Sequence, residues 1–367
     1  MKKLAACDMI ILLMVVALTC FGVVMVYSAS SVMAAKKFHD NFYFLKRQGM
    51  FALAGFGVMY FIMQLDYHVW KKLAVPVLLG CLVLLIIVLI PGLGGSAKGA
   101  ARWIRFPGFS LQPSEFAKIA LIMYMAYSLD KKQDKVKFFS SGFLPYMVVL
   151  AVLLLLLLKQ PDLGAALTLG LVAMVMLFAA GTRPTYLISM VLLALPFLYF
   201  LVMNVDYRRR RVLAFLNPWE DPLGNGFQIL QSWYAFGAGG IVGQGLGEGK
   251  QKLFYLPEAH TDFILSVVGE ELGLVGVLVI ASMFFLLVWR TIRVAMNAED
   301  PFGRFLAFGI AVLFGIEAFV NMGVVTGLFP TKGLALPFIS YGGSSLLISL
   351  FAAGIVLNIS SRMRSQP

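Results

Sequence analysis

The chain has 367 residues, of which 60% are hydrophobic and only 13% are charged, and its formal net charge is +12. Soluble globular domains contain about 45–50% apolar residues, so this composition excludes a large soluble domain and predicts one integral membrane domain over residues 1–367. Cys7, Cys20 and Cys81 lie in or beside apolar stretches and indicate neither a disulfide framework nor a metal site, and the three histidines are too scattered for a zinc cluster.

Ten apolar segments predict an all-α polytopic fold with ten transmembrane helices, because a helix needs about 20 mostly apolar residues to cross the hydrocarbon. In chain order they are residues 9–27, 49–63, 73–90, 116–127, 143–158, 163–180, 186–203, 263–289, 305–328 and 345–359. We expect the first to be a retained helix and not a cleaved signal peptide. The fourth is short for a full crossing, and we expect it to extend at both ends.

Basic residues in the short loops predict the orientation. Ten crossings place both termini on one side, where fourteen Lys and Arg lie, against nine on the other side outside the long loop. Since cytoplasmic loops are enriched in Lys and Arg, the bias favours cytoplasmic termini. The many cations left on the outer face indicate an anionic ligand there, such as a lipid phosphate or pyrophosphate, or else pairing with anionic headgroups.

A long extracytoplasmic loop, about residues 204–262, separates the seventh and eighth spans. It begins with four arginines at residues 208–211 and contains a glycine-rich stretch at residues 239–249. A dinucleotide fingerprint would need a preceding strand and a following helix, so the glycines favour close backbone packing or a mobile loop.

Asp262 ends this loop, immediately before an apolar helix. Ionisable residues at membrane depth are costly and are therefore candidates for function. The alternative is that Asp262 stabilises the start of the helix through its exposed amides and dipole. Glu270 and Glu271 lie about two turns deeper, where they either support the site or pair with a buried base such as Lys118 or Lys332.

Three basic residues could bind the anion. Lys118 lies just inside the fourth helix, where it either binds the anion or snorkels to headgroups. Arg102, with Lys98 and Arg105, lies in the glycine-containing segment KGAARWIRFPGF, which is either a phosphate clasp or an ordinary cationic loop.

Lys332 belongs to the segment FPTKGLALPFISYGGSS between the last two spans. Pro330 and Pro337 prevent a continuous helix, yet the segment is apolar. Irregular backbone at membrane depth is tolerated only against protein or a water-filled cavity, so we predict a re-entrant loop with Lys332 pointing into a cavity. The alternative is a surface loop that contacts headgroups.

Several of these segments together resemble the SEDS family, the polytopic proteins of bacterial shape, elongation, division and sporulation. The resemblance covers nearly the whole chain and depends on YSAS, KGAARWI, QPSEFAK, QPDLG, NPWEDPLGNGFQILQS, YLPEAHTDFI with GEELG, and FPTKGLALPFISYGGSS. The segments PTKG, FLKRQ and RRRRVLAFLNPW resemble the division branch more than the elongation branch.

The resemblance implies a peptidoglycan glycosyltransferase that polymerises lipid II at the outer face of the bacterial cytoplasmic membrane during cell division. It also implies as partners a growing glycan on undecaprenyl pyrophosphate, a class B penicillin-binding transpeptidase and other divisome proteins, and no nucleic acid. A lipid II flippase, a pure scaffold, and an elongation or sporulation relative remain alternatives.

The resemblance further implies that Asp262 is the essential aspartate and that Arg102, Lys118 and Lys332 are functional basic positions. We hypothesise that Asp262 is the general base of an inverting displacement and that the three cations stabilise the departing pyrophosphate. Supporting positions are expected at Glu258, His260, Glu270, Glu271 and Ser340. No resident metal is expected, although a divalent cation (Mg or Mn) could accompany the pyrophosphate.

Overall fold

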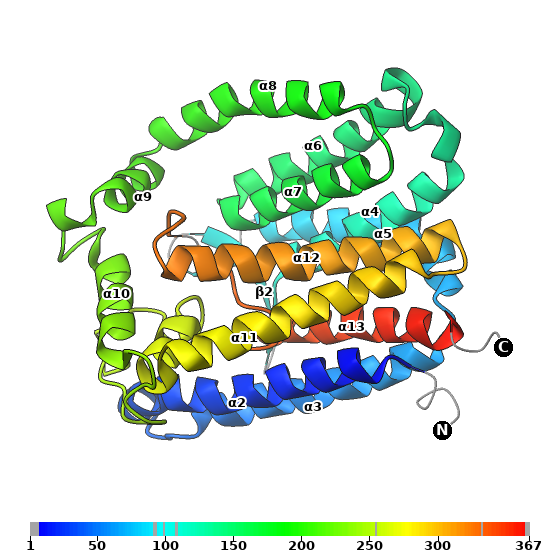
Figure 1. Cartoon of the computed structure of the whole chain (residues 1–367). Helices are drawn as coiled ribbons and strands as arrows, with labels where there is room; N and C mark the ends of the chain where they lie inside the picture. Colours follow the sequence, from blue (N-terminus) through cyan, green and yellow to red (C-terminus); the bar gives the residue numbers. More distant parts are fainter. Residues whose placement is uncertain are drawn as a thin grey trace.

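The computed structural model describes residues 7–90, 94–97, 100–106, 109–253, 255–331 and 333–363. Over these residues the chain forms a bundle of long helices that lie side by side (Figure 1). The helices and strands are α2 (Met9–Phe38), α3 (Tyr43–Gln64), α4 (His68–Leu89), β1 (Gly94–Ala97), β2 (Ala100–Phe106), β3 (Phe109–Leu111), α5 (Pro113–Lys131), η1 (Gln133–Lys135), η2 (Phe139–Phe143), α6 (Leu144–Lys159), α7 (Leu163–Ala179), α8 (Pro184–Met203), α9 (Asp206–Leu216), η3 (Pro218–Glu220), α10 (Phe227–Gly239), α11 (Ile264–Met296), α12 (Pro301–Val325) and α13 (Gly343–Met363).

The all-α membrane fold is confirmed, and each of the ten predicted spans overlaps one helix, α2 to α8 and α11 to α13. Within the described residues, seven helices are both long and apolar enough to cross a membrane. The fourth span does extend at both ends, because α5 begins at Pro113 and continues to Lys131. The chain is therefore a multi-pass membrane protein.

Both described ends of the chain lie at the same end of the bundle. The backbone N–H of Asp8, before α2, donates to Ser360 Oγ near the end of α13 at 3.0 Å. Arg290 of α11 pairs with the same aspartate at 2.6 Å. This arrangement agrees with an even number of crossings.

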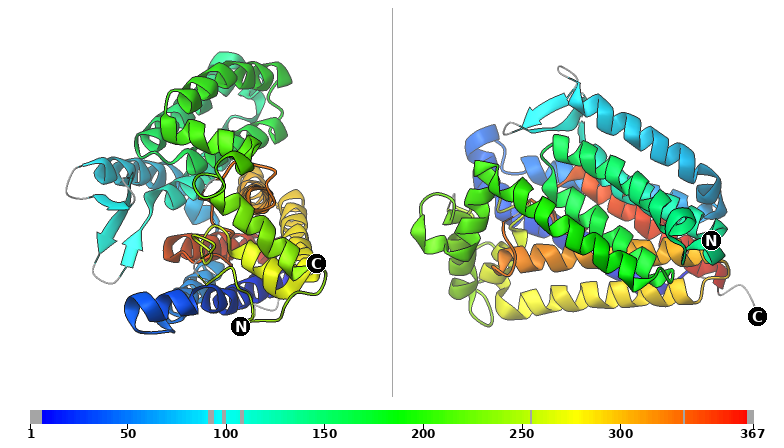
Figure 2. Two further views of the ribbon diagram at one scale, coloured as in Figure 1. Left: turned by 90° about the vertical axis from the view of Figure 1, so that its left-hand side faces the viewer. Right: turned by 90° about the horizontal axis from the view of Figure 1, so that it is seen from above.

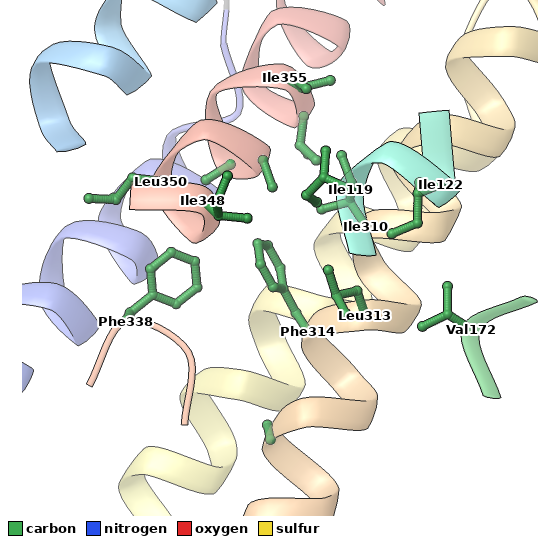
Figure 3. Close-up of a cluster of buried hydrophobic side chains, with 14 of the residues drawn as sticks. Ile119, Ile122, Val172, Ile310, Leu313, Phe314, Phe338, Ile348, Leu350 and Ile355 are labelled. Carbon is green, nitrogen blue, oxygen red and sulfur yellow. The ribbon is translucent and has the colours of Figure 1, made fainter. Parts of the chain in front are cut away.

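Residues 326–342, which we name the re-entrant loop, penetrate the bundle. Phe338 and Ile339 are 1% and 0% exposed, and the ring of Phe338 packs edge-on against Phe314 of α12, with centroids 5.1 Å apart (Figure 3). A Cβ on Gly22, near the middle of α2, would lie 2.6 Å from Ile339 Cα, so only glycine permits this approach. The burial of these residues confirms that the loop re-enters the bundle, and the alternative of a surface loop on headgroups is wrong. That Lys332 points into a cavity stays a prediction, because Lys332 lies outside the described residues.

Two segments differ from the expected plain loops. The three strands form an antiparallel sheet in the order β1-β2-β3, in which Ile104 pairs with both Gly94 and Leu111. Figure 2 shows this sheet standing out from the helices next to α4. The long connection between α8 and α11 contains two further helices, α9 and α10.

Helix α8 packs differently from the other spans. Only 6% of its apolar window is buried, and it arches along the outer edge of the bundle (Figure 1). Leu192 and Leu193 are 61% and 77% exposed. This apolar surface is suited to contact with lipid.

Candidate functional site

Asp262 lies in the turn that precedes α11 and faces the re-entrant loop. A Cβ on Gly333 would lie 2.8 Å from Asp262 Oδ2, so the carboxylate is in close contact with the Gly333 backbone. The N-cap position of α11 is Phe263, so Asp262 lies one residue before the helix, and its stabilisation of the helix start stays a prediction. The carboxylate is instead directed towards the segment that contains Lys332.

The turn that carries Asp262 is bonded to the re-entrant loop at two neighbouring residues. Ser340 Oγ donates to the carbonyl of Thr261 at 2.7 Å, and the N–H of Tyr341 donates to the carbonyl of His260 at 3.0 Å. The hydroxyl of Thr261 donates to the Glu258 carboxylate at 3.1 Å. Glu258, His260 and Ser340 are thus placed where they can fix the turn.

Lys332 and Lys98 lie outside the described residues, but the neighbours of Lys332 are described and locate that part of the loop. Arg211 of α9 donates from Nη1 to the carbonyl of Thr331 at 3.2 Å. On the other side, Gly333 contacts Asp262. Thr331 and Gly333 thus contact a guanidinium and the carboxylate, respectively. Sequence reasoning noted the arginine run but did not predict that Arg211 joins the site, since nothing in the run distinguishes one arginine from the next.

Lys118 is buried, at 4% exposure, between two carboxylates. Its ammonium pairs with Glu115 at 2.8 Å and with Glu317 of α12. Snorkelling to headgroups is therefore wrong. Direct contact between Lys118 and a pyrophosphate stays a prediction, because in this structure the ammonium is engaged by the two acids.

Arg102 of β2 bonds to the turn between α6 and α7. Its Nε donates to the carbonyl of Gln160 at 3.1 Å, and Nη2 donates to the carbonyl of Pro161. The adjacent Asp162 caps α7 through Ala165 N–H and accepts from Ser114 of α5 at 3.2 Å. Asp162 thus orders this turn, and the contacts bring together β2, the start of α5 and the segment QPDLG.

This assembly reaches the re-entrant loop at Leu334, because a Cβ on Gly164 would lie 3.2 Å from the side chain of Leu334. Within the described residues, Arg102 is thus linked to the re-entrant loop only through the turn before α7, and its hydrogen bonds are to backbone carbonyls.

Glu270 and Glu271 are buried and bonded to the long connection, not to Lys118. Glu271 pairs with Lys252 at 2.7 Å and accepts from Ser28 Oγ at 2.7 Å. Glu270 accepts from the backbone N–H of Lys250 at 2.7 Å. The predicted pairing of Glu271 with a buried base is confirmed, but the base is Lys252 and not Lys118. The end of the long connection packs against α11 and brings Lys252 to Glu271.

The same region explains the glycines of the long connection. Helix α11 is interrupted at Gly273, with φ 65° and ψ −165°. The N–H of Gln244 donates to the free carbonyl of Glu270 at 3.0 Å, and the N–H of Leu274 donates to the carbonyl of Gly240 at 2.9 Å. A Cβ on Gly239 would lie 1.9 Å from the carbonyl oxygen of Gly269. Close backbone packing, one of the two predictions for these glycines, is confirmed.

The NPWEDPLGNG segment forms a compact turn on the same connection. Asp221 accepts from the backbone N–H of Asn225 at 2.8 Å and from its side-chain amide at 2.9 Å. These bonds stabilise the ionised form, with the backbone bond the larger effect, and lower the pKa of the Asp221 carboxyl. The segment therefore orders the chain between α9 and α10.

Among the residues that the structure describes, no group of three or more His, Cys, Asp and Glu side chains could hold a metal ion. The side chains at this site do not fit a protein-held metal.

Comparison with known proteins identifies the family. A family model described as "Cell cycle protein", for FtsW, RodA and SpoVE, matches residues 8–365. The chain belongs to the SEDS family. "Probable peptidoglycan glycosyltransferase FtsW" of Geobacter metallireducens is 74% identical over 367 residues, which cover 100% of this chain and 98% of the relative. Stage V sporulation protein E of Bacillus subtilis is 45% identical over 357 residues, which cover 97% of this chain and 98% of that protein.

Solved SEDS structures share the fold. A chain from the work "Structural coordination of polymerization and crosslinking by a peptidoglycan synthase complex" superposes with a TM-score of 0.80 at 31% identity, over 98% of this chain and 99% of that one. Thermus thermophilus rod shape determining protein RodA gives a TM-score of 0.73 at 27% identity, over 98% of both chains. Among these relatives, the chain is more similar to the Geobacter FtsW than to the sporulation protein.

Proposed function

We propose that this SEDS protein is a peptidoglycan glycosyltransferase that polymerises lipid II during cell division. The observation that carries the proposal is the contact of the Asp262 carboxylate with Gly333, in a segment that contains Lys332 and receives Arg211. A carboxylate and basic side chains that meet at one loop suit a reaction in which a hydroxyl loses its proton while a diphosphate departs. The names of the Geobacter relatives support the same activity.

The proposed reaction is one direct displacement at the anomeric carbon of the donor sugar. The 4-hydroxyl of the acceptor GlcNAc attacks MurNAc C1, the new C–O bond forms, and the bond from C1 to undecaprenyl pyrophosphate breaks. Asp262 accepts the hydroxyl proton, and the α-linked donor gives a β-1,4 product by inversion. An ordinary carboxylate, with a pKa near 3.9, is a weak base, so its contribution depends on placement close to the hydroxyl and on late proton transfer.

Negative charge grows on the leaving pyrophosphate in the transition state, and fixed cations stabilise it. We assign this role to Arg211, which bonds to Thr331 of the re-entrant loop, and to Lys332, the residue that follows Thr331 in the sequence. Arg102 is bonded to backbone carbonyls and keeps its positive charge, so we assign it a supporting electrostatic role. Lys118 is compensated by Glu115 and Glu317, so in this structure it supports the site by joining α5 to α12. Mg or Mn bound to the pyrophosphate would add to the same stabilisation.

The lipid tails are proposed to lie in grooves between helices, next to the exposed face of α8. The end of the bundle with the site is assigned to the extracytoplasmic side and the end with both termini to the cytoplasmic side of the inner membrane. This orientation agrees with the excess of basic residues on the terminal side.

A flippase would use buried acids along a transbilayer path. Three of the candidates are instead neutralised or bonded within the protein: Glu317 by Lys118, Glu271 by Lys252, and Glu270 by backbone N–H groups. These contacts favour polymerisation over transport.

We further propose that the chain works with a class B penicillin-binding transpeptidase and other divisome proteins. Support comes from the peptidoglycan synthase complex with 31% sequence identity, whose name joins polymerisation to crosslinking.

The test uses purified protein with its transpeptidase partner and lipid II. We expect glycan strands that lysozyme cleaves, as β-1,4 linkage requires. In parallel, vesicles with labelled lipid II report transbilayer movement. Movement without any polymer would refute the proposal and favour the flippase.

A further inference from the structure

Asn321 of α12 joins the two segments that face each other across the site. It is 1% exposed. Its Nδ2 donates to the backbone carbonyl of Asp262 at 2.9 Å and to the backbone carbonyl of Leu334 at 2.7 Å. Those carbonyls lie in the turn before α11 and in the re-entrant loop, so one side chain sets the position of both.

The bonds also fix the orientation of the amide. An asparagine amide has two N–H donors on one atom and only an acceptor on the other. Because both neighbours are carbonyl oxygens, the nitrogen must face them, and reversing the amide would direct an oxygen at two oxygens.

The remaining atom, Asn321 Oδ1, is buried and has no hydrogen-bond partner within the described part of the chain. A buried acceptor without a partner destabilises the folded protein. An apolar residue of similar volume would avoid this destabilisation. We therefore infer that the polar side chain serves to donate the two hydrogen bonds.

We propose that Asn321 is a positioning residue that fixes the distance between the Asp262 carboxylate and the segment with Lys332. The inference rests on the glycosyltransferase function proposed above. Asn321 acts through the backbone on both sides, because it bonds to the main-chain carbonyls of Asp262 and Leu334. Leu334 follows Gly333, which contacts the Asp262 carboxylate. Asn321 also lies one helical turn from Glu317, the partner of Lys118. One face of α12 therefore carries both the bridging amide of Asn321 and the buried ion pair.

The experiment compares Asn321→Leu with Asn358→Leu. Asn358 of α13 is a matched control, because it is also 1% exposed and also bridges two backbone groups: it accepts from Tyr67 N–H at 3.0 Å and donates to the carbonyl of Met63 at 2.7 Å. Those residues lie at the end of the bundle that carries the termini, away from the site.

Two quantities are measured for each variant: the rate of lipid II polymerisation, and the temperature of thermal unfolding in detergent. We expect both leucine variants to lose similar thermal stability, and only Asn321→Leu to lose kcat, by about 100-fold as for a misplacement near 1 Å, with KM little changed. Asn321→Ser, which keeps one hydroxyl donor, should give an intermediate kcat and remains informative if the leucine variant does not fold.

Equal kcat losses in the two leucine variants, or a change in KM alone for the Asn321 variants, would overturn the positioning role. The variant Asp262→Asn distinguishes a failure of the proposed glycosyltransferase mechanism from a failure of the positioning role. If that variant polymerises normally, the proposed general base is wrong. If it is inactive while both Asn321 variants keep wild-type kcat, only the positioning role is wrong.

Discussion

Replacing Gly333 by alanine should damage catalysis while leaving the fold intact. The added Cβ would lie 2.8 Å from Asp262 Oδ2, whereas ordinary contacts begin at 3.4 Å. The carboxylate must therefore retreat by about 0.6 Å, the difference between these distances. Since a misplacement of about 1 Å can cost about 100-fold in rate, we expect kcat to fall about tenfold.

The matched control is Gly342→Ala in the same re-entrant loop, where the added Cβ would lie 3.6 Å from Ser345 Cβ, an ordinary contact. Gly333 is exposed, so both proteins should unfold at nearly the wild-type temperature. The assay is the initial rate of lipid II polymerisation at saturating substrate. Wild-type kcat in Gly333→Ala, or an equal loss in Gly342→Ala, would refute the placement of the carboxylate against Gly333.

Two further predictions concern charges. Arg211→Ala should slow polymerisation about tenfold or more, as expected when a preorganised charge is removed from a developing anion, whereas Arg210→Ala, at an exposed position of the same helix, should not; equal rates in the two variants would remove Arg211 from the site. Lys252→Met should lower the free energy of unfolding by about 3–5 kcal/mol because it leaves Glu271 buried and unpaired. The double variant Lys252→Met with Glu271→Gln should recover part of that loss, and thermal melting in detergent measures both; no recovery would contradict the pairing.

The sequence predicted the helices that consist of long apolar segments, but it did not predict the contacts between segments that are distant in the chain. Ten apolar segments predicted ten helices because hydrophobic length alone determines a span. Pro330 and Pro337 predicted the re-entrant loop because proline prevents a continuous helix, whereas the apolar residues favour membrane depth, where irregular backbone must lie against protein or a cavity. These inferences need no knowledge of neighbours.

The partners of the charged side chains could not be predicted in the same way. Glu271 pairs with Lys252 because α11 breaks at Gly273 and the long connection folds back onto it. Asn321 is one polar residue within an apolar span, and nothing in the sequence indicates that its amide bonds to the carbonyls of Asp262 and Leu334. The sheet of β1 to β3 was missed because its short strands resemble a glycine-containing loop.

The most direct test of the account is the rate of lipid II polymerisation by Asp262→Asn, measured with the transpeptidase partner present. The amide keeps the shape of the side chain and removes its ability to accept a proton. We expect polymer formation to be lost while thermal stability and partner binding stay near wild type. Polymerisation at the wild-type rate by this variant would contradict the general-base role of Asp262.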